Sequence, residues 1–178
     1  MICTTRIFAF SLFTSMMVMA FAGPSLAADS CDLVFNAMTK AATTPSHRYS
    51  THTMPSPNGN KTTEAETIYL QNKIYIRTSG KWMESHESPS EMLQQLQENR
   101  NDSEPTCQFV RNESVNNESA ALYSLRSENE DVKEDGQIWI STHSGLTLRE
   151  EVDMDTGDSE GKSHISIRYE YSNVKPPM

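Results

Sequence analysis

The residues of this sequence that could do chemistry are three cysteines, five histidines and one glutamate set in an apolar strand pattern. Cys3 falls in an N-terminal apolar segment, which leaves Cys31 and Cys107 as an even pair. Two distant cysteines are typical of a structural disulfide in an exported protein, whereas redox pairs favour the Cys-x-x-Cys spacing. A bridge that closes so long a loop stabilises a domain by about 4 kcal/mol on the chain-entropy model. A redox pair and a metal site are the alternatives to this predicted disulfide.

The histidines show no spacing typical of a metal site. His47 and His52 lie an odd number of positions apart on a predicted strand, so their side chains should point to opposite faces. His143 falls in a predicted hairpin connection, where a solvated loop residue is expected. No nucleophile elbow, phosphate-binding loop or metal-ligand motif occurs in the sequence. The sequence therefore predicts a protein that is not an enzyme and has no cofactor or metal.

Glu150 interrupts the apolar face of a strand predicted over residues 146–154, which also carries Leu148 and Val152. A buried carboxylate is unfavourable unless it is paired, and Arg149 should point to the opposite face of this strand. One interpretation is a bulge, or a register in which Glu150 faces water. The other places Glu150 at the mouth of a cavity, where it would contact the head group of a ligand.

The N-terminal residues predict a removable export signal over residues 1–27, followed by a single domain over residues 28–178. Arg6 supplies the positive charge, residues 7–22 are mostly apolar, and small residues precede a cleavage site after Ala27. An uncleaved membrane anchor is the alternative. The remainder contains no second long apolar run, so no stable membrane insertion of the mature chain is expected.

The charge and hydrophobic content of the chain exclude one class of function and bear on the size of the core. The formal net charge of −9 argues against a nucleic-acid binder, which needs cationic side chains to track phosphates. The chain is 36% hydrophobic, and a large share of these residues belongs to the predicted signal. The core of the mature domain should therefore be thin, and the predicted disulfide would compensate for it.

Two helices are predicted, one at the start of the mature chain and one near its middle. Apolar residues recur at helical spacing over residues 31–42, with Ser30 as the expected N-cap. The second helix should start at Ser88, because Pro89 suits the first helical position and Glu91 completes a capping box.

The rest of the chain predicts an antiparallel sheet with one apolar and one solvated face, since apolar and polar residues alternate between turn sequences. The predicted strands cover residues 47–54, 64–71, 73–78, 81–83, 106–111, 120–126, 137–142, 146–154 and 164–172.

The last third of the chain carries a recognisable pattern. Ile138-Trp139-Ile140 precedes a polar turn and Gly145-Leu146-Thr147-Leu148-Arg149, and the final strand is Arg168-Tyr169-Glu170-Tyr171-Ser172-Asn173-Val174. This pattern resembles the LolA-like superfamily, exported proteins built around a periplasmic lipoprotein carrier. The resemblance implies an α+β fold in which a curved antiparallel sheet, an incomplete β-barrel, has an N-terminal and a short central helix over its open side.

The resemblance also implies a function. It suggests a soluble periplasmic protein that binds a lipid, a lipoprotein acyl chain or another apolar ligand in the concave face of the sheet. The alternative is an envelope protein-interaction or stress-sensing module with a protein partner and no bound lipid, which the acidic composition favours. For the aromatic residues, core packing is the alternative to ligand contact. The candidates for the ligand-binding apolar face are Ile68, Leu70, Ile74, Ile76, Trp139, Leu146, Leu148, Tyr169 and Tyr171.

Overall fold

The computed structural model describes residues 27–102, 105–128, 132–157 and 161–177, which form two helices and an antiparallel sheet. The predicted export signal therefore lies outside the described residues, except for Ala27. Among the described residues, no helix is both long enough and apolar enough to cross a membrane. The elements are α1 (Ala27–Thr43), β1 (Ser46–Met54), β2 (Lys61–Tyr69), β3 (Ile74–Thr78), β4 (Lys81–Glu84), α2 (Pro89–Asp102), β5 (Thr106–Val115), β6 (Glu118–Glu128), β7 (Lys133–Ser141), β8 (Thr147–Asp155) and β9 (Ser163–Glu170).

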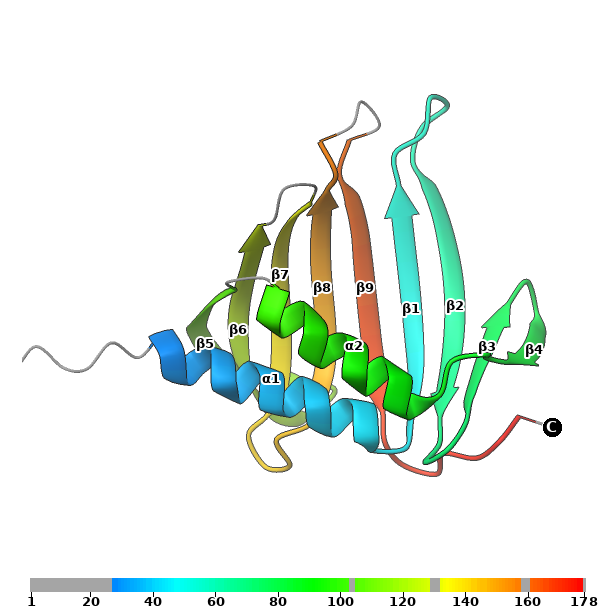
Figure 1. Ribbon diagram of the computed structural model, residues 1–178, viewed down its shortest axis with the longest axis horizontal. Coiled ribbons are helices and arrows are strands. Elements are labelled where there is room, and N and C mark those ends of the chain that lie inside the picture. The colour runs from blue at the N-terminus through cyan, green and yellow to red at the C-terminus, as the bar shows by residue number, and fades with distance from the viewer. Residues whose placement is uncertain (1–26, 103–104, 129–131, 158–160, 178) are drawn as a thin grey trace, which may run out of the picture.

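The nine strands form one open sheet in the order β4-β3-β2-β1-β9-β8-β7-β6-β5. The last strand, β9, lies between β1 and β8, so it joins the N-terminal strands to the later meander. Both helices lie across the same side of the sheet, which we call the helix face, and the opposite side is the outer face (Figure 1). The predicted α+β fold with an unclosed sheet and two covering helices is confirmed.

Helix α1 packs its apolar stripe onto the helix face. Val34 and Ala37 are buried in one cluster with Tyr123, Ile138 and Ile140 of the sheet. The predicted disulfide is present: it joins α1 to β5, with the two Cα atoms 5.0 Å apart and the two cysteines separated by 76 positions. The helix begins at Ala27 rather than beside Ser30. The prediction of Ser30 as the N-cap is therefore wrong, because the helix extends upstream into the expected signal boundary.

Helix α2 starts where its capping box predicts. The backbone N–H of Glu91 donates to Ser88 Oγ at 3.3 Å, and the backbone N–H of Ser88 donates to Glu91 Oε2 at 2.7 Å. The helix packs mainly against α1, where Arg100 pairs with Asp32 and lies 4.9 Å from the ring centroid of Phe35. Its other apolar residues are only half-buried, so α2 is held more weakly than α1.

The strands form at the predicted places, although β5, β6 and β7 are longer than expected. A bulge between β7 and β8 changes the pattern of faces. Ile140 pairs with Thr147 and Trp139 pairs with Arg149, which leaves Leu148 without a partner in the register. Leu148 packs with Trp139 instead. The expectation that Leu148 shares a face with Glu150 is wrong, because a bulge shifts the alternation by one residue.

Candidate functional site

A cavity of about 170 Å³ lies between the two helices and the helix face. Helix α1 supplies Phe35 and Met38, and α2 supplies Leu96. These side chains reach the cavity because the apolar stripes of both helices face the sheet. Its apolar lining includes Phe35, Met38, Leu96, Leu125, Ile138 and Val152.

Gly136 provides the space in the middle of this lining. It lies in β7, paired with Leu125 on one side and Val152 on the other. A Cβ atom added at Gly136 would meet Leu125 Cβ and Val152 Cγ2 at 3.7 Å, which is ordinary van der Waals contact. A glycine inside a strand often marks a close approach of a ligand or another backbone. The same three residues also line a second, wider hollow of about 860 Å³, so the two spaces adjoin.

Glu150 is the carboxyl group at the cavity wall. It pairs in register with Ile138 and Ile167, which places it on the helix face, and it is one of the residues that line the cavity. Burial raises the pKa of Glu150 above its usual value of 4.5, while a hydrogen bond with Tyr169 and the charge of Arg48 act in the opposite direction. The carboxyl group therefore holds its proton to a higher pH than an exposed glutamate does.

The guanidinium of Arg48 makes close contacts with α1 and with two aromatic rings. Its Nη2 donates to the carbonyl oxygen of Ala41 at 3.0 Å, near the end of α1. Its Cζ lies 3.4 Å from the ring centroid of Tyr69 and 5.0 Å from that of Tyr169. Arg48 thus fastens β1 to α1 and packs on two aromatic rings, and it influences Glu150 through its charge.

A second carboxyl group, that of Glu134, lines the cavity on the other side of Gly136. Strand alternation places Glu134, Gly136 and Ile138 on the same face of β7. Ser127 Oγ donates to Glu134 Oε2 at 3.2 Å. Arg126 also contributes to the lining, and its Nε lies 3.6 Å from Asp135 Oδ1.

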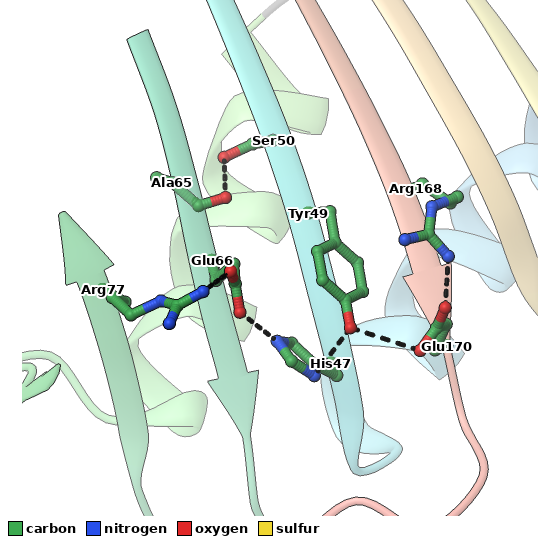
Figure 2. A network of polar contacts seen from close by, with 8 residues as sticks. All are labelled: His47, Tyr49, Ser50, Ala65, Glu66, Arg77, Arg168 and Glu170. Atoms are coloured by element: carbon green, nitrogen blue, oxygen red, sulfur yellow. Dashed lines mark hydrogen bonds and ion pairs between the residues drawn. The ribbon is translucent and has the colours of Figure 1, made fainter. Parts of the chain in front are cut away.

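The outer face carries a separate polar network that crosses four strands (Figure 2). His47 Nε2 lies 3.0 Å from Glu66 Oε2, and Arg77 also pairs with Glu66. On the other side, the hydroxyl of Tyr49 lies 3.2 Å from His47 Nδ1 and 3.4 Å from a carboxylate oxygen of Glu170. Burial lowers the pKa of His47 below 6.5. This network connects β3, β2, β1 and β9, and it faces away from the cavity.

His47 and His52 lie on opposite faces, as the sequence predicts, because their register partners on β2 and β9 alternate between the faces. His143 is exposed in the turn before β8. Within the described ranges, no group of three or more His, Cys, Asp or Glu side chains could hold a metal ion.

The predicted apolar-face residues do not form one wall. Ile74, Ile76 and Tyr169 lie on the helix face by their register. Ile68 lies on the outer face, because it pairs with His47 and Tyr75. The other five are distributed between the outer face and the turns. Trp139 donates to Glu113, and Leu148 packs on Trp139. Leu70 and Leu146 lie just outside strands, and the hydroxyl of Tyr171 donates to the carbonyl oxygen of Thr147 at 2.6 Å.

The sequence analysis did not identify most of the cavity lining. Phe35 and Met38 were identified only as part of a helical stripe, and Leu96 only as part of a helix edge. Gly136 could have been found from the sequence, because a glycine within a strand suggests that a ligand or another backbone approaches closely at that position. Of the predicted ligand-contact residues, Glu150 lines the cavity.

No protein-family model and no curated protein sequence matches the chain. Solved structures do match it at low identity. MucB in complex with MucA(peri) is 12% identical with a TM-score of 0.44, and the match covers 84% of this chain and 57% of that one. A LolA superfamily protein from Nitrosomonas europaea is 9% identical with a TM-score of 0.28, and the match covers 79% of this chain and 91% of that one.

A putative outer membrane lipoprotein-sorting protein domain from Vibrio parahaemolyticus is 7% identical with a TM-score of 0.26, and the match covers 81% of this chain and 93% of that one. The LolA superfamily, which the sequence pattern resembles, is thus represented among the solved structures that this chain matches.

Proposed function

We propose that this chain is an exported periplasmic carrier, which holds a lipid, a lipoprotein acyl chain or another apolar ligand between its helices and its sheet. The observation that carries this proposal is the cavity beneath α2, with its apolar walls and the carboxyl group of Glu150. Concave apolar sites with few polar groups are typical of small-molecule binding. Glu150 would then contact the head group of the ligand.

The size of the cavity bears on how a ligand would enter. A closed apolar cavity of about 150 Å³ accommodates a benzene-sized molecule, so the space of about 170 Å³ in this protein suits a short apolar segment. A longer chain would extend into the adjoining hollow or displace α2. Helix α2 is the more easily displaced of the two helices because it rests mainly on α1 and its apolar residues are only half-buried.

Native mass spectrometry of the mature protein, purified from the periplasm and then extracted with organic solvent, tests the proposal. A bound lipid or acylated peptide would support the carrier function and identify the class of its ligand. A protein at its bare mass that also takes up no fluorescent acyl probe after delipidation would contradict it. The mass also reports whether residues 1–27 have been removed.

Filling the cavity provides a test within the chain. In Gly136→Leu the new side chain would occupy the space between Leu125 and Val152, and the φ angle at Gly136 is one that any residue adopts. We expect uptake of an acyl probe to fall at least tenfold. Met83→Leu, an apolar exchange at an exposed position of β4, is the control and should bind as the unchanged protein does. Equal uptake by both variants would place the ligand elsewhere.

An envelope protein-interaction module is the second candidate function, and one observation favours it. Leu33, Phe109 and Val110 are exposed by 55%, 47% and 46%, and they lie on α1 and on the edge strand β5. Exposed apolar residues beside an unpaired strand edge suit a protein partner. Crosslinking in cells from position 110 tests this candidate. Capture of one specific periplasmic protein that Phe109→Ser abolishes would support it.

A further inference from the structure

The cavity is apolar along its length and acidic on both sides of its centre. Glu134 and Glu150 lie on either side of Gly136 on the helix face, with Gly136 and Val152 in the register row between them. Ile138 is the register partner of Glu150. At about 3.4 Å per strand residue, the four steps along β7 from Glu134 to Ile138 span about 14 Å. A slot of this kind offers an apolar stretch with a carboxyl group near each end.

The charges around the slot favour a cationic over an anionic guest. Arg48 donates to the end of α1, packs on aromatic rings and acts on Glu150 through its charge, and Arg126 is paired with Asp135, so the close polar contacts of both guanidinium groups are made with other partners. The formal net charge of −9 adds a general repulsion of anions. A carboxylate in apolar surroundings is stabilised most by an opposite charge close to it.

Glu150 accepts a hydrogen bond from Tyr169 and lines the cavity, and an ionised carboxylate has two oxygens that can each accept hydrogen bonds. An ammonium group is a compact cation with several N–H donors, and it can bridge to such an oxygen while its alkyl chain lies along Phe35, Met38 and Val152. A fatty-acid carboxylate at the same place would face another carboxyl group.

We propose that this site selects ligands with an aliphatic amine head, and that Glu150 binds the ammonium group while the alkyl chain lies over Gly136. This inference rests on the proposed function, because it assumes that the cavity holds an apolar ligand. It adds the chemical class of the head group and the residue that recognises it.

Calorimetric titration of the delipidated protein with octylamine, 1-octanol and octanoate tests the inference, because the three probes share one chain length and differ in the charge of the head. At pH 7.5 we expect octylamine to bind at least tenfold more tightly than octanol, and octanoate to bind most weakly. Glu150→Gln should reduce octylamine affinity to that of octanol and leave octanol unchanged. Glu170→Gln, which removes a carboxylate on the outer face, is the control and should preserve the order.

A pH series on the unchanged protein provides a second test that needs no variant. The preference for octylamine should decline as the pH falls and Glu150 becomes protonated, while octanol binding stays constant. Equal binding of the three probes, or tightest binding of octanoate, would overturn the amine selectivity and leave the carrier function standing. Binding of none of the three probes, together with no uptake of the longer acyl probe, would overturn both.

Discussion

Glu150 is a residue whose burial lowers the stability of the fold and whose carboxyl group could serve ligand binding. Its carboxyl group lies on the helix face between Ile138 and Ile167, where an apolar side chain would be the simplest choice. Tyr169 provides a hydrogen bond, which offsets part of the cost of burying this group. A polar residue retained on an apolar wall is a candidate for ligand contact.

The raised pKa of Glu150 makes its contribution to stability depend on pH. The folded protein holds this proton to a higher pH than the unfolded chain, so the free energy of unfolding falls as the pH rises from about 4.5 through the folded pKa. Glu150→Gln should therefore be more stable than the unchanged protein at pH 7.5, by about 1.4 kcal/mol for each pH unit that separates the two pKa values. Urea unfolding at pH 7.5 and pH 4 measures this gain, which should disappear at pH 4. A gain of the same size at both pH values would contradict the assignment.

His47 on the outer face should respond to pH in the opposite direction. Burial lowers its folded pKa below 6.5, so its contribution to stability is complete above pH 6.5 and is lost as the pH falls through 6.5 toward the folded pKa. His47→Gln should reduce the loss of stability between pH 7.5 and pH 5.5. His164→Gln, at the exposed partner of Asp153, is the control. Thermal unfolding at the two pH values tests this, and an unchanged pH dependence in His47→Gln would contradict it.

At the scale of the elements, the strength of docking differs between the two helices. Helix α1 is fixed by a disulfide and a buried apolar stripe, whereas α2 depends on its capping box and on contacts with α1. An N-cap serine contributes about 1 kcal/mol to helix stability. Ser88 therefore contributes a sizeable part of the free energy that keeps α2 folded over the cavity.

Ser88→Ala should loosen α2 without unfolding the sheet. We expect faster amide hydrogen exchange over residues 89–102 and unchanged exchange in β7 and β8, because the lost cap destabilises the helix by about 1 kcal/mol. Gln95→Ala is the control, since Gln95 is exposed in the interior of α2 and lies outside the capping box. Faster exchange throughout the sheet would show that α2 is integral to the core.

The element boundaries show where sequence patterns succeed and where they fail. Ser88, Pro89 and Glu91 predicted the start of α2 correctly, because a capping box is a local device that needs no tertiary context. Leu148 was assigned to the wrong face, because a bulge is fixed by the pairing of two strands and leaves no distinct mark in the sequence of one. The start of α1 was also missed, because the helix continues into residues attributed to a signal.

In the candidate site, too, local sequence patterns identified some residues, and the residues brought together by tertiary packing were missed. Glu150 was identified because a charge in an apolar alternation is visible in the sequence itself. The partners of Glu150 at the cavity, Phe35, Leu96 and Gly136, come from three distant segments, and only the packing of helices on the sheet brings them together. Ile68 was misplaced relative to Ile76 because the turn between β2 and β3 sets a register that the alternation does not determine.

At the scale of the whole molecule, the disulfide connects the first helix to the edge of the sheet. Its chain-entropy contribution is about 4 kcal/mol for a loop of this length, which is a large part of the stability of a typical domain. The Cys31→Ser/Cys107→Ser double variant should therefore unfold at a distinctly lower urea concentration. Equilibrium unfolding of both proteins measures the difference. An equal midpoint for the two would mean that the bridge is absent or contributes nothing.

The place of β9 between β1 and β8 has a consequence for biosynthesis. Without β9 the strands would form two separate sheets, β4-β3-β2-β1 and β8-β7-β6-β5, because β9 provides the only pairing that joins them among the described strands. Contacts between segments so far apart in the chain form late in folding, since closing the intervening loop is entropically unfavourable. The nine-stranded sheet therefore cannot assemble until residue 170 has been synthesised, and before that point the two sets of strands remain unjoined.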